Sequence, residues 1–201
     1  TMVFGSAVAI AQRDVKRMLA FSSIAHAGFI LTGVIALNKS GLSASLFYLT
    51  TYAFSTLAAF GVITLVRDAT GEVTDLNKWA GLGKKSPLIA GAFAFLLLSF
   101  AGIPLTAGFI GKFSIFSAAY EAGGKALVIA GVLSSAVAAF FYIRVIVLMF
   151  FKDAVEDGTT VVIPSALTRS VVLISGIATI LFGVVPQPLI NFINTYASFI
   201  R

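Results

Sequence analysis

One lysine, Lys112, lies inside a long apolar segment of the chain. The sequence has no acidic residue between Asp75 and Glu121, so no carboxylate close in sequence can pair with it. A charge inside a membrane costs roughly 2.5–3.5 kcal/mol on insertion scales, which makes such a residue a functional candidate. Removal from water disfavours the charged form of a lysine, so the group could load and release a proton. The other interpretation is an anchoring lysine that reaches the membrane surface.

The only histidine, His26, lies in the apolar stretch AFSSIAHAGF. Ser22 and Ser23 precede it by four and three residues, so all three share one face of a helix. A neutral imidazole can both accept and donate a proton, which suits a proton relay. A buried histidine that is hydrogen-bonded to serines or to a neighbouring helix is the other interpretation. Lys112 in the same chain favours the relay.

Further polar groups lie in other apolar segments. Arg144 precedes Lys152 by eight residues, which is about 12 Å of helix. Because arginine stays protonated, we interpret Arg144 as a structural or field-setting charge and not as a proton carrier. Tyr142 could hydrogen-bond into a polar path, although a packed aromatic ring is the commoner role. Helix packing explains the hydroxyl groups of the third apolar segment. They belong to Tyr48, Tyr52, Ser55 and Thr56.

The composition indicates an integral membrane protein. The chain is 59% hydrophobic and only 11% charged, with a mean hydropathy of +1.02, whereas soluble domains carry about 25% charged residues. The basic residues are scattered between apolar segments, which argues against a nucleic-acid-binding stripe. The absence of cysteine excludes disulfides, iron–sulfur ligation and thiolate zinc sites. With a single histidine, we expect no metal site in this chain.

The apolar segments predict an all-α, polytopic transmembrane bundle, with residues 1–201 forming a single transmembrane domain. About six helices are expected, one of them partial and one discontinuous. Their expected bounds are 1–11, 15–37, 42–66, 87–120, 126–151 and 164–185, with an interfacial tail at 186–201. Residues 67–86 and 152–163 are expected to be polar, charged loops. The segment 1–11 is too short to cross a membrane, so we expect the chain to be a piece of something longer.

The segment 87–120 is expected to be broken near residues 101–107. Gly102, Pro104 and Gly108 are poor residues for the interior of a helix. Lys112 follows Pro87 by 25 residues, and a continuous helix of that length, about 37 Å, would carry it through the hydrocarbon layer. An unwound stretch would keep Lys112 nearer the middle of the membrane. This pattern is typical of a discontinuous helix that lines a polar path.

The distribution of Lys and Arg predicts the orientation. Successive loops alternate sides, and nine of the 14 basic residues fall on the side of the first, third and fifth loops. These are Arg13, Lys16, Arg17, Arg67, Lys78, Lys84, Lys85, Lys152 and Arg169. The opposite side holds Lys39, Lys125 and Arg201. The charged loops are therefore expected in the cytoplasm and the C-terminus outside the cell.

Three stretches resemble a known family in the same order along the chain. They are DVKRMLAFSSIAHAGF, SFAGIPLTAGFIGKF and FGVVPQPLINFI. They resemble subunit N of the bacterial proton-pumping NADH–quinone oxidoreductase, respiratory complex I, and the second stretch is the most specific. Subunits L and M and the multisubunit Na⁺/H⁺ antiporters share the general pattern. M-type members have a glutamate at the position of Lys112, and L-type members have a variant Gly-Leu-Pro-Pro motif and a long C-terminal extension, so the resemblance favours N.

The resemblance implies fourteen transmembrane helices with two inverted five-helix repeats. This chain would hold the end of helix nine through helix fourteen, which covers the second repeat. Lys112 would be the broken-helix lysine near the outward half of the proton path, and His26 would link toward it. The implied place is the inner membrane of a bacterial cell.

The resemblance also implies a role within an enzyme complex. The chain would be a proton-translocating subunit that performs no redox chemistry, with NADH, FMN, iron–sulfur clusters and quinone in partner subunits. Its partners would be other membrane-arm subunits, especially other antiporter-like ones, and lipid. Two alternatives remain open at this point. One is a subunit of a cation/proton antiporter or membrane-bound hydrogenase, and the other is a structural membrane scaffold.

Overall fold

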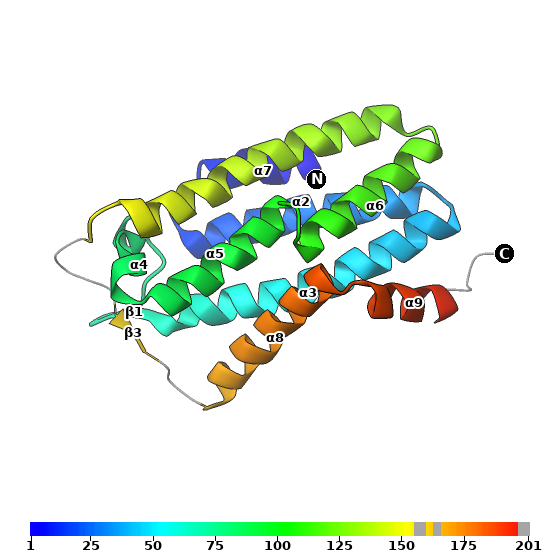
Figure 1. Ribbon diagram of the computed structural model, residues 1–201. Coiled ribbons are helices and arrows are strands. Elements are labelled where there is room, and N and C mark those ends of the chain that lie inside the picture. Colours follow the sequence, from blue (N-terminus) through cyan, green and yellow to red (C-terminus); the bar gives the residue numbers. More distant parts are fainter. Residues whose placement is uncertain (155–159, 163–165, 197–201) are drawn as a thin grey trace.

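A computed structural model describes residues 1–154, 160–162 and 166–196 (Figure 1). The elements in chain order are α1 (Met2–Ile10), α2 (Val15–Ile35), α3 (Lys39–Leu65), β1 (Val66–Asp68), β2 (Gly71–Glu72), the 3-10 helix η1 (Leu76–Trp79), α4 (Leu82–Lys85), α5 (Pro87–Ala101), α6 (Ala107–Glu121), α7 (Lys125–Phe151), β3 (Thr160–Val161), α8 (Ala166–Val184) and α9 (Gln187–Tyr196).

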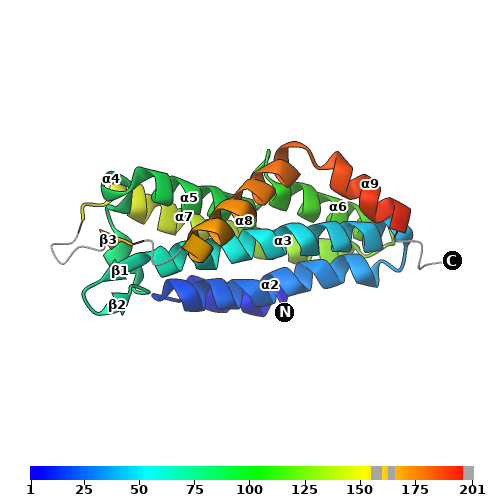
Figure 2. The same ribbon diagram turned by 90° about the horizontal axis from the view of Figure 1, so that it is seen from below.

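Long apolar helices make up most of the molecule. In the described part of the chain, α2, α3, α7 and α8 are long and apolar enough to cross a membrane, and α5 is a shorter apolar helix. Helices α2, α3 and α7 run along the bundle together with the α5–α6 pair, and α8 crosses α3 at an angle (Figures 1 and 2). The expected class, an all-α membrane bundle, is confirmed.

The helix ends follow from local sequence chemistry. The side chains of Asp14, Asn38 and Thr106 cap α2, α3 and α6 by accepting hydrogen bonds from backbone N–H groups three residues further on. Such caps satisfy donors that the first turn of a helix leaves free. Pro87 begins α5, where its missing N–H costs nothing. These capping residues and Pro87 therefore mark where the helices begin.

The interruption between α5 and α6 occupies residues 102–106. Gly102 ends α5 in the left-handed conformation, with φ of 82°, and its N–H donates back to the carbonyls of Leu98 and Ser99. Glycine adopts this conformation at little cost. Leu105 also has a positive φ, 72°, and its side chain is exposed. The two half-helices are therefore joined by an irregular turn near the middle of the bundle (Figure 1).

The expectation of plain loops at the charged end is wrong for residues 67–86, which carry defined structure. Strand β1 pairs antiparallel with β2 and with β3, in the order β2-β1-β3, and η1 and α4 follow. We call residues 66–86 together with β3 the loop layer. Strands of two or three residues leave no periodic pattern in a sequence, so hydropathy alone does not detect them.

The loop layer ties the three charged connections together at one end of the bundle. The Asp14 backbone bridges to Asp75, and the Val15 N–H donates to the Thr74 carbonyl at 2.8 Å. The buried Trp79 donates from Nε1 to the Val73 carbonyl at 2.9 Å, and its ring packs on Phe93 of α5. The layer is thereby continuous with the core.

The residues expected to form an interfacial tail contain α9. This helix lies along the outside of the bundle against α3, where Ile193 packs on Phe47 (Figure 2). Residues 197–201 of that tail, and residues 155–159 and 163 of the expected charged loop, lie outside the described residues.

Candidate functional site

Lys112 is buried in the middle of the bundle and is held by three oxygen acceptors. Its side chain belongs to α6, and the residue is only 4% exposed. The Nζ atom donates to the carbonyl oxygens of Phe100 and Ala101, at 2.8 and 3.3 Å, and to Ser135 Oγ of α7 at 2.9 Å. Within the described part of the chain, no carboxylate pairs with Lys112. The structure thus does not show the anchoring lysine of the second interpretation.

The broken helix builds this site. Phe100 and Ala101 end α5, so their carbonyls are free of intrahelical partners and carry the negative end of the helix dipole. Gly102 leaves room for the lysine, since a Cβ atom there would lie 3.1 Å from Lys112 Cδ. Gly108 lets α6 approach α5, because a Cβ at this position would overlap the carbonyl oxygen of Ser99. In an uninterrupted helix the same carbonyls would accept hydrogen bonds from backbone N–H groups of the next turn.

His26 lies at the centre of a second buried polar group. Its Nδ1 is 2.7 Å from the Tyr48 hydroxyl of α3, and its Nε2 is 3.1 Å from the Tyr142 hydroxyl of α7. Tyr142 also hydrogen-bonds Ser22 of α2. One ring nitrogen of a neutral imidazole donates and the other accepts, and a hydroxyl can do either. The series Ser22–Tyr142–His26–Tyr48 can therefore pass a proton by reversing each hydrogen bond.

Ser23 belongs to this region but does not hydrogen-bond His26. It donates to the Leu19 carbonyl and accepts from the Tyr52 hydroxyl at 2.7 Å. The Tyr52 ring stacks on the imidazole, with centroids 4.5 Å apart. Helix packing is the role that the sequence predicts for Tyr48 and Tyr52, whereas in the structure both hydroxyls hydrogen-bond side chains of α2. Their spacing of four residues along α3 is the signal that could have placed both hydroxyls toward α2.

Among the described residues, His26 and Lys112 are not joined by a hydrogen bond. Two aromatic side chains lie between them. The Phe29 ring packs against the imidazole at 5.7 Å and lies 4.8 Å below Lys112 Nζ. The Phe100 ring is 5.6 Å from the imidazole, while its backbone carbonyl binds the lysine. Proton exchange between the two groups would require water or a rotation of these rings.

Arg144 lies apart from both groups. Its Nη1 donates to the carbonyl of Ile10, the last residue of α1, at 3.2 Å. A cation at this position faces the negative end of a helix. The side chain also lines an apolar groove of about 440 Å³ on α7, together with Lys152. The hydrogen bond thus links α7 to the end of α1.

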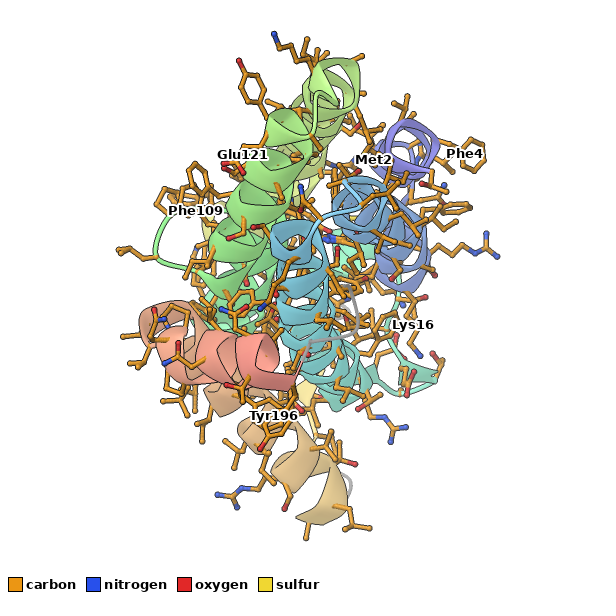
Figure 3. The ribbon with its side chains drawn as sticks, turned by 90° about the vertical axis from the view of Figure 1, so that its right-hand side faces the viewer. Met2, Phe4, Lys16, Phe109, Glu121 and Tyr196 are labelled. Carbon is orange, nitrogen blue, oxygen red and sulfur yellow. The ribbon has the colours of Figure 1, made fainter. Side chains whose placement is uncertain are left out.

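A pocket of about 320 Å³ adjoins Lys112. Ser135 and Gly102 line it, and Phe109 and Phe113 of α6 form part of its apolar wall. Phe109 lies on the opposite flank of the bundle from Phe4 of α1 (Figure 3). In the described residues there is no group of three or more His, Asp or Glu side chains that could hold a metal ion.

The fold and the site define a class of protein: a polytopic membrane bundle in which a discontinuous helix holds a buried lysine that, among the described residues, has no carboxylate partner. Residues 1–138 match the family described as NADH:quinone oxidoreductase/Mrp antiporter, TM. The chain belongs to this family, and the resemblance inferred from the sequence is confirmed.

Curated relatives carry one recurring description. The "NADH-quinone oxidoreductase subunit N" of Rhodococcus opacus is 56% identical over 201 residues, which is 100% of this chain and 37% of the relative. The "NADH-quinone oxidoreductase subunit N 3" of Streptomyces griseus is 58% identical over the whole chain and 36% of its own length. The chain thus spans little more than a third of these relatives.

Solved structures agree with the fold. A chain of respiratory complex I from Thermus thermophilus with bound aureothin is 32% identical, with a TM-score of 0.80 over 94% of this chain and 42% of that chain. A chain of the Mrp complex from Dietzia, 24% identical, has a TM-score of 0.85 over 100% of this chain and 45% of that one. The latter supports the fold alone.

Proposed function

We propose that this chain is part of a proton-translocating subunit N of NADH–quinone oxidoreductase, with Lys112 as the group that carries the proton. The single observation behind the proposal is the buried lysine that three neutral oxygens hold at the broken helix. A lysine paired with a carboxylate would be locked in its charged form, whereas neutral partners let both protonation states exist. The assignment to this redox complex rests on the descriptions of the curated relatives.

His26 supplies the second station of the proposed path. Its two tyrosine partners connect α3 and α7 across the bundle, and Ser22 extends the series along α2. Phe29 and Phe100 separate this series from Lys112. Such a separation suits a pump, because a path that is open at all times would let protons run back. Moving one charge against 100 mV requires about 2.3 kcal/mol.

In this proposal the chain holds no redox cofactor. NADH, FMN, iron–sulfur clusters and quinone act in partner subunits, and other antiporter-like membrane-arm subunits lie beside this one. Redox energy then reaches Lys112 through changes of charge and packing in neighbouring subunits, since a neighbouring charge in a low-dielectric bundle shifts proton affinity strongly.

Lys112→Met tests the proposal in the complete complex. We expect proton pumping and quinone reduction to fall together, with normal amounts of assembled complex, because methionine fills the space without a titratable group. Lys125→Met is the matched control, since Lys125 is an exposed lysine at the end of the same bundle. If Lys112→Met and Lys125→Met both keep full pumping, the chain is a scaffold and the proposal fails.

A cation/proton antiporter subunit is the second candidate, favoured by the description of the matched family, which names the Mrp antiporter beside NADH:quinone oxidoreductase. The two candidates differ in the transported ion. Membrane vesicles that carry the complete complex distinguish them by sodium: redox-driven pumping without sodium supports the first candidate. Sodium-dependent proton exchange that occurs without NADH supports the second.

The proposed orientation places the loop layer in the cytoplasm of a bacterium and the α2–α3 turn outside. The charged connections do share one end of the bundle, and an excess of Lys and Arg marks the cytoplasmic side. The chain has no cysteine, so single cysteines at Lys39 and Lys152 can be labelled selectively in a subunit freed of others. A membrane-impermeant thiol reagent added outside intact cells should label Lys39→Cys and not Lys152→Cys.

A further inference from the structure

The three acceptors of Lys112 differ in what they can do when the lysine changes charge. A lysine ammonium has three N–H donors and no acceptor. The two carbonyls and the Ser135 hydroxyl match these three donors one to one. The geometry therefore satisfies the protonated lysine completely.

The neutral amine has different needs. It keeps two N–H donors and gains one lone pair, which requires a donor of its own when buried. A carbonyl oxygen accepts but cannot donate. The Phe100 and Ala101 carbonyls can therefore accept from the ammonium, and from the two N–H groups of the neutral amine, but they cannot donate to its lone pair. A hydroxyl both donates and accepts. Of the three partners, Ser135 alone can accept from the ammonium and also donate to the lone pair of the neutral amine.

We propose that Ser135 is the proton-exchange partner of Lys112 and joins it to water in the adjoining pocket. In the step, the Nζ–H bond that points at Ser135 breaks and its electron pair stays on nitrogen. A new bond forms between that proton and Oγ, and the original hydroxyl proton leaves for a water molecule, which becomes hydronium. The new Oγ–H then donates to the Nζ lone pair. The reverse sequence reloads the lysine.

The position of Ser135 supports this role. The residue is only partly buried and lines the pocket of about 320 Å³ together with Lys112. A water molecule takes up about 30 Å³ of liquid volume, so the pocket has room for water beside the polar groups of Ser135 and Lys112. Its neighbour on α7, Ser134, is buried and instead lines a separate pocket toward α1. Two adjacent serines on one helix thus differ in that only one contacts the lysine.

Ser135→Ala, Ser135→Thr and Ser134→Ala test the inference in the complete complex, beside Lys112→Met. The inference rests on the proposed function, and Lys112→Met reports on that function separately. We expect Ser135→Ala to slow coupled pumping about tenfold, the lower end of what loss of one hydrogen bond to a charged group costs. Ser135→Thr, which keeps the hydroxyl, and Ser134→Ala should stay within about twofold of the parental rate, because neither variant removes that bond. Assembly is measured for each variant.

The outcomes separate the inference from the proposed function. If Lys112→Met stops pumping while Ser135→Ala behaves like Ser134→Ala, the role of Ser135 is refuted and the proposed function stands. An equal loss in Ser135→Ala and Ser135→Thr would mean that packing matters and the hydroxyl does not, which also refutes it. If Lys112→Met pumps normally, both proposals fall. Should Ser135→Ala not assemble, Ser135→Cys replaces the hydroxyl with a weaker donor of similar size and must show the same fall.

Discussion

The bundle holds its charges in two contrasting ways, at the break in the middle and in the loop layer at one end. In and beside the loop layer, each of the described ion pairs joins a lysine to a carboxylate near water. They are Lys16–Glu72, Lys78–Asp68 and Lys84–Asp153. Lys112 is buried and is bound by backbone carbonyls and a hydroxyl. The comparison teaches that an ionic partner favours the charged form of a group, whereas the neutral partners of Lys112 fit the proposal that this lysine changes its charge.

Three carboxylates at the charged end of the bundle have lowered pKa values because of their hydrogen-bond and ionic partners. The Lys78 ammonium and the Thr70 hydroxyl and N–H hold the pKa of Asp68 well below its usual range. Hydrogen bonding to Lys84 lowers the pKa of Asp153 in the same way. For Asp14, partial burial acts to raise the pKa, but hydrogen bonds from Thr74 and Arg17 outweigh it and the pKa falls. These groups stay ionised at neutral pH and cannot cycle protons there.

The largest expected effect comes from closing the space between the half-helices. Gly108→Ala would place a Cβ on the Ser99 carbonyl oxygen, and backbone must move to admit it. We expect a cost of about 3 kcal/mol, the upper end for overpacking, and a marked loss of assembled complex. Gly91→Ala is the control, because a Cβ at Gly91 of α5 meets nothing within 4 Å. Normal assembly of Gly108→Ala would show that the break tolerates a wider separation than the structure has.

Gly102→Ala sharpens the comparison by disturbing the lysine site with less damage to the fold. The residue has a left-handed backbone, which costs an L-residue about 1–2 kcal/mol. Its Cβ would also press on Lys112 Cδ at 3.1 Å. We expect a complex that assembles in reduced amounts and pumps more slowly per assembled complex. If each assembled complex pumps as fast as the parental protein, Gly102 does not affect the function of Lys112.

Tyr48→Phe probes the polar group around His26 with a smaller change. Loss of the hydroxyl leaves His26 Nδ1 without the partner that lies at 2.7 Å. We expect this loss to lower the stability by about 1 kcal/mol. We expect slower pumping with little change in assembly, measured by vesicle acidification. Tyr120→Phe, at an exposed tyrosine, should leave pumping unchanged. Equal rates for the two variants would remove Tyr48 from the path.

The smallest effect is expected in the loop layer. Asp68→Asn should leave pumping intact and lower thermal stability slightly at pH 7, since it removes a carboxylate whose pKa is lowered by Lys78. A lowered pKa means that the contribution is present at neutral pH and fades as the pH falls below about 4, the ordinary aspartate value. The melting curves of parental and variant complexes should therefore converge in acid. A pumping defect in Asp68→Asn would contradict the division of roles.

Much of the membrane architecture was accessible from the sequence. Apolar length predicts the crossings, because a bilayer requires about 20 such residues, and Gly102 and Pro104 predict an interruption that the structure places at residues 102–106. The loop layer could not be predicted. Its strands have two or three residues, and their pairing depends on β3, about ninety residues away from β1 in the sequence.

By itself, the sequence determined that Lys112 stands in an apolar segment behind a helix break and that a histidine occurs in a second one. Only the tertiary structure decided their partners. The Phe100 and Ala101 carbonyls, the Ser135 hydroxyl and the ring of Phe29 come from three different helices. Hydropathy records how much of a segment is apolar, whereas partners depend on helix rotation and close approach at glycines such as Gly108. Those are properties of the packed bundle and not of any one segment.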